Sequence, residues 1–157
     1  ESEPIQEAIR HYDPPRHRCE PVGEWEGRIF INDSKATNLH ALISSLRGQE
    51  APVVLIVGGK NKGLDYGEMI PFLPETVSHA VCLGEMAEPI RQSWEGVVSC
   101  GIATDMMDAV RLAADASQPG QVVLFSPGTS SFDMYSGYVE RGDAFRDAVT
   151  QLKQARA

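Results

Sequence analysis

The sequence contains no apolar run close to the ~20 residues that a helix needs to cross a bilayer, so a membrane-spanning segment is not expected. Positive charge is also scarce, because 14 lysines and arginines stand against 22 acidic residues and leave a net charge of −8. A protein that binds DNA or RNA needs a clustered basic face, so a nucleic acid is not expected as a partner. A signal peptide is missing too, and the first residue is Glu1 instead of Met. We interpret the sequence as a piece of a longer protein.

Cysteine and histidine are too few and too scattered to indicate a disulfide framework or a local metal site. Cys19, Cys82 and Cys100 are odd in number and widely spaced, which favours reduced thiols in a cytoplasmic protein. The two later cysteines lie in apolar runs and are expected in the core. The four histidines show neither HxH nor HxxxH spacing, so no metal ligand is predicted from them. With 157 residues, of which 42% are hydrophobic, the chain is long enough for one domain with a substantial core.

Short β-branched runs alternate with amphipathic segments along most of the chain. Glu26-Gly27 is a two-residue turn signal between two strand-like stretches, which predicts a β-hairpin over 18–25 and 28–33. Further strands are expected at 53–57, 80–84, 97–100 and 122–125. Helices are expected over 3–10, 38–47 and 86–94, after an N-cap at Thr104, and around Phe145, Val149 and Leu152. This order predicts an α/β fold whose mostly parallel sheet carries helices on both faces and begins with a β-hairpin.

In such a sheet, ligands bind beyond the carboxyl ends of the strands. That rule selects the loops at 33–38, 58–65, 84–86, 101–105 and 126–132. The first of them offers Asp33, Lys35 and Thr37 at a strand end, just before a helix that should begin at Thr37 or Asn38. A cation, a hydroxyl and free backbone N–H groups at a helix N-terminus suit a phosphorylated or carboxylated small molecule. Asp33 would accept hydrogen bonds from ribose hydroxyls or form an Asx turn.

Two lysines stand in the glycine-rich loop Gly58-Gly59-Lys60-Asn61-Lys62-Gly63. The loop is not a Walker A motif, since GKS and GKT are both absent, and it is not a GxGxxG motif either. The lysines are either solvated side chains or a clamp for an anion. On a chain with a net charge of −8, cations gathered at one ligand edge favour the clamp.

The loop after the last predicted strand is rich in hydroxyl groups. Ser130 or Ser131 is predicted to cap the next helix, and the same geometry would let Ser131 grip a carboxylate. Near the start of the chain, Arg18 is either a surface residue or a group that stacks on a base or pairs with phosphate. No nucleophile with a partner base and no pair of acids stands out. The sequence therefore offers binding groups without an evident catalytic base.

Three blocks together resemble the C-terminal domain of the Mur ligase family, in particular the ligases that add D-glutamate to UDP-N-acetylmuramoyl-L-alanine. They are His17-Arg18, the run Asp33-Ser34-Lys35-Ala36-Thr37-Asn38, and the stretch from Ser126-Pro127 through Ser131-Phe132-Asp133 to Glu140-Arg141-Gly142. Gly58-Gly59 with Lys62 and Asp65 is a weaker fourth match. The order and spacing agree over nearly the whole chain, and the DSKATN block is specific to the members that add D-glutamate.

The resemblance implies a Rossmann-like third domain, over residues 16–157, of an ATP-dependent amide ligase of peptidoglycan synthesis. Residues 1–15 would remain from the central ATPase domain, which would hold the ligands of Mg²⁺, and the fragment alone would be inactive. By match to the family motifs, D-glutamate would be surrounded by Lys35, Thr37, Lys62, Ser131, Phe132 and Tyr138. The contacts to ATP would come from His17, Arg18 and Asp33. No residue is assigned as a certain catalyst, and Lys35 would support the reaction.

The chain departs from the family pattern at Pro15-Arg16, Gly128, Thr129, Met134-Tyr135 and Tyr138. Two other interpretations also stay open at this point. One is a non-catalytic module that binds a nucleotide or another anion on the same fold. The other is a Mur-type ligase for a different amino acid.

Overall fold

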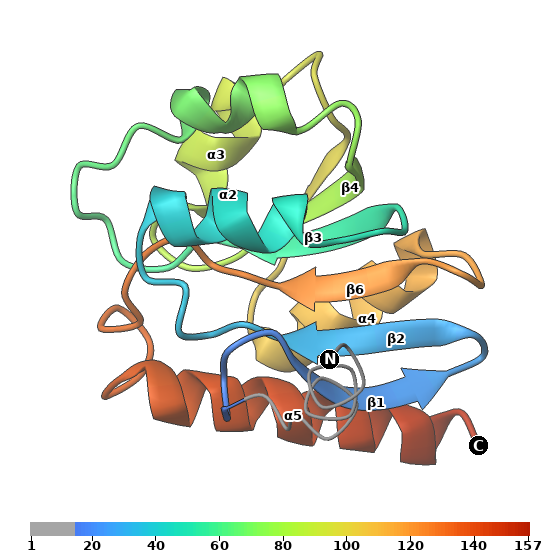
Figure 1. Ribbon diagram of the computed structural model, residues 1–157. Helices are drawn as coiled ribbons and strands as arrows, with labels where there is room; N and C mark the ends of the chain where they lie inside the picture. The colour runs from blue at the N-terminus through green and yellow to red at the C-terminus, as the bar shows by residue number, and fades with distance from the viewer. Residues whose placement is uncertain (1–14) are drawn as a thin grey trace, which may run out of the picture.

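Six strands form one sheet in the order β1-β2-β6-β3-β4-β5 (Figure 1). The computed structural model describes residues 15–157, so the helix predicted over 3–10 lies outside the described residues. An antiparallel hairpin joins β1 (Glu20–Trp25) to β2 (Arg28–Asn32). The other strands pair in parallel with their neighbours: β3 (Val53–Val57), β4 (Val77–Cys82), β5 (Cys100–Ile102) and β6 (Val122–Phe125). The predicted α/β fold, with its mostly parallel sheet and N-terminal hairpin, is confirmed.

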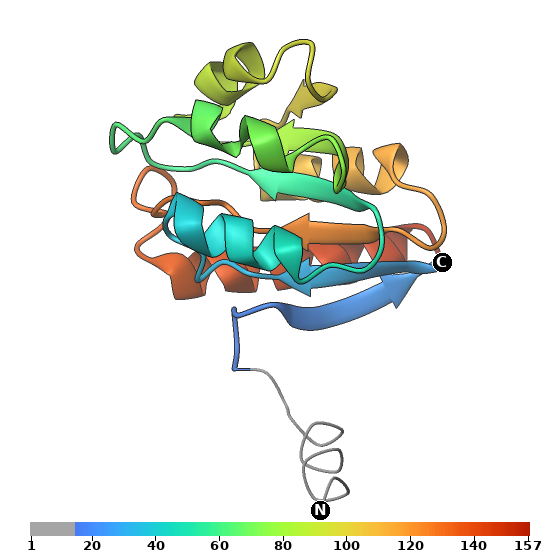
Figure 2. The same ribbon diagram turned by 45° about the horizontal axis from the view of Figure 1, so that its top comes forward.

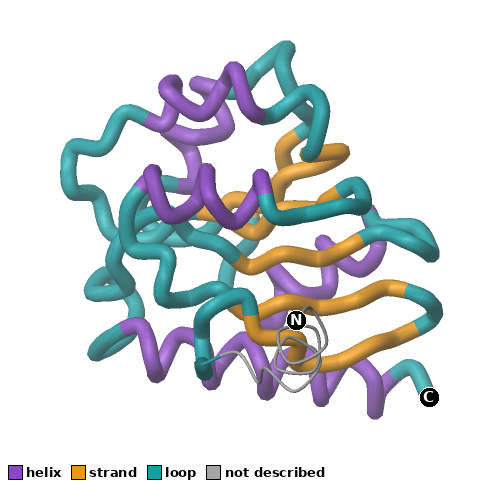
Figure 3. Tube along the Cα trace, in the orientation of Figure 1, coloured by secondary structure: helices purple, strands orange, loops and turns teal. Residues whose placement is uncertain are grey.

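Helices cover both faces of the sheet (Figures 2 and 3). One face carries α2 (Leu39–Arg47), the 3-10 helix η1 (Tyr66–Phe72) and α3 (Ala87–Ser93). The other carries α4 (Met106–Ala116) and α5 (Tyr138–Ala155). Alternate residues of β3 enter the two cores, because successive side chains of a strand point to opposite faces. Within residues 15–157, no helix combines the length and the apolar character needed to traverse a bilayer.

The helix that follows β2 begins as the sequence predicts. The Asn38 side chain caps α2 by accepting a hydrogen bond from the Ala41 backbone N–H at 2.8 Å. Leu39, Leu42 and Leu46 form the buried stripe of the helix. The amino end of α2 therefore stands at the carboxyl end of β2, which is the edge where the sequence predicts a ligand.

Three predictions about the middle of the chain need correction. The strand expected at 97–100 lies at 100–102, because the N–H groups of Val97 and Val98 donate back to the Trp94 carbonyl at 3.0 and 3.3 Å. The strand expected at 80–84 spans 77–82 instead. Thr104 is not the cap of α4. Asp105 fills that position by accepting from the Asp108 N–H at 2.8 Å, and Thr104 donates to the Asp108 carboxylate.

The loop after β6 is longer than predicted, and α5 begins only at Tyr138, with Gly137 at the cap position. Neither Ser130 nor Ser131 caps this helix, so that prediction is wrong. The N–H groups of Met134 and Tyr135 donate to the Ser131 carbonyl and close a separate turn. Further along α5, the predicted stripe of Phe145, Val149 and Leu152 is buried.

Candidate functional site

The carboxyl ends of β2, β6 and β3 lie side by side, so the loops that follow them meet at one edge of the sheet, on the left in Figure 1. We call the segments 33–38, 58–65 and 126–137 the site loops. Their backbones are joined directly: the Gly128 N–H donates to the Ala36 carbonyl at 2.9 Å, and the Lys60 N–H donates to the Ser130 carbonyl at 2.9 Å. The loops are therefore built as one unit.

Most of the residues predicted to surround an amino-acid ligand lie on this edge. The Lys62 Nζ donates to the Thr37 carbonyl at 3.3 Å, and the Lys35 Nζ lies 4.2 Å from the centre of the Tyr138 ring. Ser131 is buried in the same loop that carries the exposed Phe132. Residues from three separate segments are thus brought together, as the sequence predicts, while their contacts to a ligand stay predictions.

A pocket of about 340 Å³ opens between the start of the hairpin, the loop 33–38 and the amino end of α2. It is lined by Arg18, Asp33, Lys35, Ala36, Thr37, Asn38, Ala41 and Ser44. A larger hollow of about 650 Å³ lies at the opposite edge of the sheet, around His79 and Gln121, and no lysine, arginine or acidic residue lines it. The smaller pocket is therefore the better candidate for a charged ligand.

Three cations at this edge have no acidic side chain within ion-pair distance in residues 15–157. Within residues 15–157, Arg18, Lys35 and Lys62 form no ion pair, whereas the Lys60 Nζ lies 3.2 Å from a Glu85 carboxylate oxygen. The net charge of the whole chain is −8, so these cations stand out against an acidic background. An edge of this kind attracts small anions such as carboxylates and phosphates.

Asp33 lines the pocket and is almost fully buried. One carboxylate oxygen accepts from the Cys19 N–H at 3.1 Å, and the other accepts from the hydroxyl groups of Ser45 and, at 2.7 Å, Ser126. These partners lie far away in the sequence, so the side chain makes no Asx turn. No local pattern points to Ser45 or Ser126 as partners. The contact between Asp33 and a nucleotide stays a prediction.

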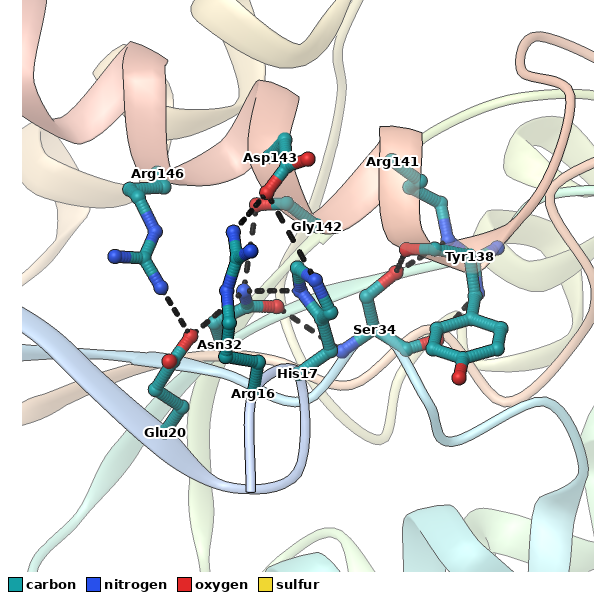
Figure 4. A network of polar contacts seen from close by, with 10 residues as sticks. All are labelled: Arg16, His17, Glu20, Asn32, Ser34, Tyr138, Arg141, Gly142, Asp143 and Arg146. Atoms are coloured by element: carbon teal, nitrogen blue, oxygen red, sulfur yellow. Dashed lines mark hydrogen bonds and ion pairs between the residues drawn. The ribbon is translucent and has the colours of Figure 1, made fainter. Parts of the chain in front are cut away.

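His17 is buried between the hairpin and α5 (Figure 4). Its Nδ1 lies 2.9 Å from the Asn32 amide nitrogen, which donates to it, and its Nε2 lies 3.8 Å from an Asp143 carboxylate oxygen. A side chain on Gly142 would collide with the imidazole. Burial lowers the pKa of His17, which keeps the ring neutral at pH 7. These contacts give His17 a structural task, and its contact with a nucleotide stays a prediction.

Arg141 is a functional candidate to which the sequence assigned no role, although it stands in one of the blocks that carry the family resemblance. It lies in the first turn of α5 and is only 2% exposed. Its Nε donates to the Ser34 hydroxyl at 3.0 Å, and its Nη2 donates to the carbonyls of Ser34 and Thr129 at 2.8 and 2.9 Å. The available signal is helical spacing, since the stripe that begins at Phe145 continues four residues back to this arginine.

Within residues 15–157, no three His, Cys, Asp or Glu side chains come together in a way that would hold a metal ion. In the site loops the Ser126 hydroxyl donates to the Asp33 carboxylate at 2.7 Å, and both side chains are buried. The arrangement can bind and orient an anionic small molecule through lysines, hydroxyls and backbone N–H groups.

Comparison with known proteins points to the same family as the matched sequence motifs. The family model for "Mur ligase, glutamate ligase domain" matches residues 17–129. The chain is 40% identical over 150 residues to the UDP-N-acetylmuramoylalanine–D-glutamate ligase of Chlamydia caviae, and 42% identical over 153 residues to that of Salinibacter ruber. These alignments cover 96% and 97% of this chain but 36% and 33% of those proteins. The chain thus spans about a third of the curated relatives' length.

Solved structures share the fold at low sequence identity. The UDP-N-acetylmuramate-alanine ligase of Thermotoga maritima matches with a TM-score of 0.61 at 13% identity, over 98% of this chain and 34% of that one. A bifunctional folylpolyglutamate synthase/dihydrofolate synthase from Yersinia pestis matches with a TM-score of 0.59 at 21% identity, over 97% of this chain and 34% of that one. The family match, which extends over most of the chain, decides the assignment: this chain belongs to the Mur ligase family, as its glutamate ligase domain.

Proposed function

We propose that this chain is the C-terminal, D-glutamate-binding domain of a cytoplasmic, ATP-dependent amide ligase that adds D-glutamate to UDP-N-acetylmuramoyl-L-alanine in peptidoglycan synthesis. Relatives that carry this ligase name and are about 40% identical over nearly the whole chain support the proposal. The observation that carries it is the meeting of Lys35, Thr37, Lys62 and the Ser131 loop at one edge of the sheet.

D-glutamate has two carboxylates, and the site loops offer two lysines that no acidic side chain of residues 15–157 neutralises. We assign one carboxylate to Lys62 and the Ser131 hydroxyl, and the other to Lys35 and Thr37. Charge-assisted hydrogen bonds of this kind are roughly twice as strong as neutral ones. The backbone at Phe132 and the ring of Tyr138 would close the side of the site. The amine of D-glutamate is then free to attack an activated acyl group.

We assign the nucleotide to the pocket that Arg18 and Asp33 line, with His17 supporting the loop beside it. The planar guanidinium of Arg18 suits a phosphate or a base. ATP and Mg²⁺ supply the phosphorylation that activates the alanine carboxylate, and we expect the metal ligands outside residues 16–157. The role of this domain is to position D-glutamate and to stabilise developing charge, with Lys35 supporting. Residues 1–15 would belong to the preceding domain.

The test is amide-bond formation by the full-length protein that contains this chain. With ATP, Mg²⁺ and UDP-N-acetylmuramoyl-L-alanine present, ADP release is measured with D-glutamate, L-glutamate, L-alanine and meso-diaminopimelate in parallel. We expect release with D-glutamate alone, and a product whose mass has increased by one glutamyl residue. The isolated chain should release no ADP.

Two outcomes would replace the proposal with an alternative. ADP release that depends on another amino acid would indicate a Mur-type ligase of different specificity. Nucleotide binding by the full-length protein, without ADP release in any arm, would indicate a binding module on the same fold.

A further inference from the structure

We propose that Arg141 is a positioning residue for the amino-acid site. Its side chain holds the site loops 33–38 and 126–137 at a fixed separation and places a buried positive charge next to them. This inference rests on the proposed function and deepens it. We call Arg141, Ser34 and Thr129, together with the carbonyl of Tyr138, the arginine clamp. Figure 4 draws Arg141, Ser34 and Tyr138 of this clamp.

Each contact of the clamp lies close in sequence to a residue that we assign to the ligand. Ser34 directly precedes Lys35, and its hydroxyl accepts from the Arg141 Nε at 3.0 Å while it donates to the Tyr138 carbonyl at 2.7 Å. The Tyr138 ring in turn lies 4.2 Å from the Lys35 Nζ. Thr129 lies two residues before Ser131 and accepts through its carbonyl at 2.9 Å. The guanidinium therefore fixes the position of the backbone just before Lys35 and just before Ser131.

The third site loop, 58–65, comes close to the Arg141 Nη1 atom. Arg141 Nη1 is buried and has no hydrogen-bond partner within residues 15–157. A side chain on Gly59 would lie 3.1 Å from this nitrogen and 2.6 Å from the Ser130 carbonyl oxygen. Since Gly59 lies in the loop that carries Lys62, the Arg141 guanidinium lies next to all three site loops.

The charge of Arg141 is costly for a purely structural residue. Within residues 15–157 it forms no ion pair, and its partners are neutral oxygens. Burial lowers its pKa to about 10, so the guanidinium remains protonated at neutral pH. A buried cation without an ion pair is destabilising in itself. An anionic substrate bound above it would benefit from that charge in a low-dielectric surrounding.

The test uses the full-length ligase with Arg141→Lys, which keeps the charge but loses the planar fork, and Arg141→Met, which loses both. We expect the D-glutamate KM to rise by about fivefold in Arg141→Lys and by more than about 20-fold in Arg141→Met, while the KM for ATP stays within about twofold of wild type. Val149→Ala, a buried change on the same helix away from the loops, controls for loss of stability. It should lower the melting temperature and leave the D-glutamate KM unchanged.

Ser34→Ala is the second variant, because it removes one hydroxyl of the clamp without placing a new group in the core. It should raise the D-glutamate KM, and its effect should not add to that of Arg141→Lys if the two residues act together. A folded Arg141→Met or Ser34→Ala enzyme with the wild-type D-glutamate KM would overturn the inference alone. Additive effects of Ser34→Ala and Arg141→Lys, or a Val149→Ala enzyme with the same KM pattern, would do so as well. Wild-type ADP release that ignores D-glutamate would overturn the proposed function, and the inference with it.

Discussion

Replacing Lys62 by Met should weaken D-glutamate binding without unfolding the domain. Lys62 is exposed, and within residues 15–157 its Nζ donates to the Thr37 carbonyl alone, at 3.3 Å. Surface substitutions of this kind usually change the free energy of unfolding by no more than about 0.5 kcal/mol. For a domain of this size that corresponds to a shift in melting temperature of about 2 °C or less. Methionine keeps most of the apolar stem, so the ammonium group is the main loss.

The expected loss of affinity follows from the bond that we assign to this ammonium. A hydrogen bond that involves a charged group contributes about 1.5–3 kcal/mol, and a solvent-exposed lysine belongs at the lower end of that range. Since about 1.4 kcal/mol corresponds to a tenfold change, we expect the D-glutamate KM to rise by about 10- to 30-fold. The bond should exist in both the bound state and the transition state, so kcat should change little.

The assay is coupled ADP release by the full-length ligase, with D-glutamate varied and the other substrates saturating. Lys60→Met is the matched control, because this lysine stands in the same loop but is paired with Glu85 at 3.2 Å. An exposed pair of this kind contributes little, so the control should keep the D-glutamate KM within about twofold of wild type. Equal effects of the two substitutions, or a wild-type KM in Lys62→Met, would refute the assignment.

Three further predictions concern stability. Phe145→Ala empties a fully buried position in the core and should lower the free energy of unfolding by about 3–5 kcal/mol, measured by urea denaturation. Thr129→Val removes the hydroxyl that donates to the Lys60 carbonyl at 2.8 Å, and should lower the same quantity by about 1 kcal/mol. Burial lowers the pKa of His17 in the folded state. The contribution of neutral His17 to the free energy of unfolding is therefore complete above the ordinary histidine pKa of about 6.5, and it is lost as the pH falls through the folded-state pKa. His17→Gln should therefore reduce the difference in unfolding free energy between pH 7.5 and pH 5, while His79, whose pKa is also lowered by burial, keeps part of it.

Local sequence patterns predicted the strands and turns whose own residues reveal whether they are buried or exposed. The run 53–57 is apolar throughout because the strand is buried on both faces, and Glu26-Gly27 marks the hairpin turn. The strand at 100–102 was misplaced because Val97 and Val98, which look like a strand, instead extend the end of α3. Its true position depends on pairing with β4, which no local pattern reveals.

The candidate site divides in the same way. The cations and hydroxyls of 33–38 and 58–65 were found because strand ends in a parallel sheet meet at one edge. The capping role expected for Ser130 and Ser131 was wrong because backbone bonds to residues far away in the sequence, such as Lys60 N–H to the Ser130 carbonyl, hold this loop away from the helix. The structural role of Arg141 was not predicted either, because a charged residue is not expected in a buried position of a helix.

The antiparallel direction of β1 has a consequence for how this domain is tethered. Because Glu20 pairs with Asn32 at the end of β2, the polypeptide reaches the described domain at the pocket edge, where Arg18 lines the pocket. If residues 1–15 belong to a preceding domain, as we propose, that domain joins this one a few residues from the pocket. A short connection of this kind would give a high effective concentration of the two domains that together form the proposed site. Residues inserted before Pro15, where they leave the contacts of His17 and Cys19 in place, are therefore expected to lower that effective concentration.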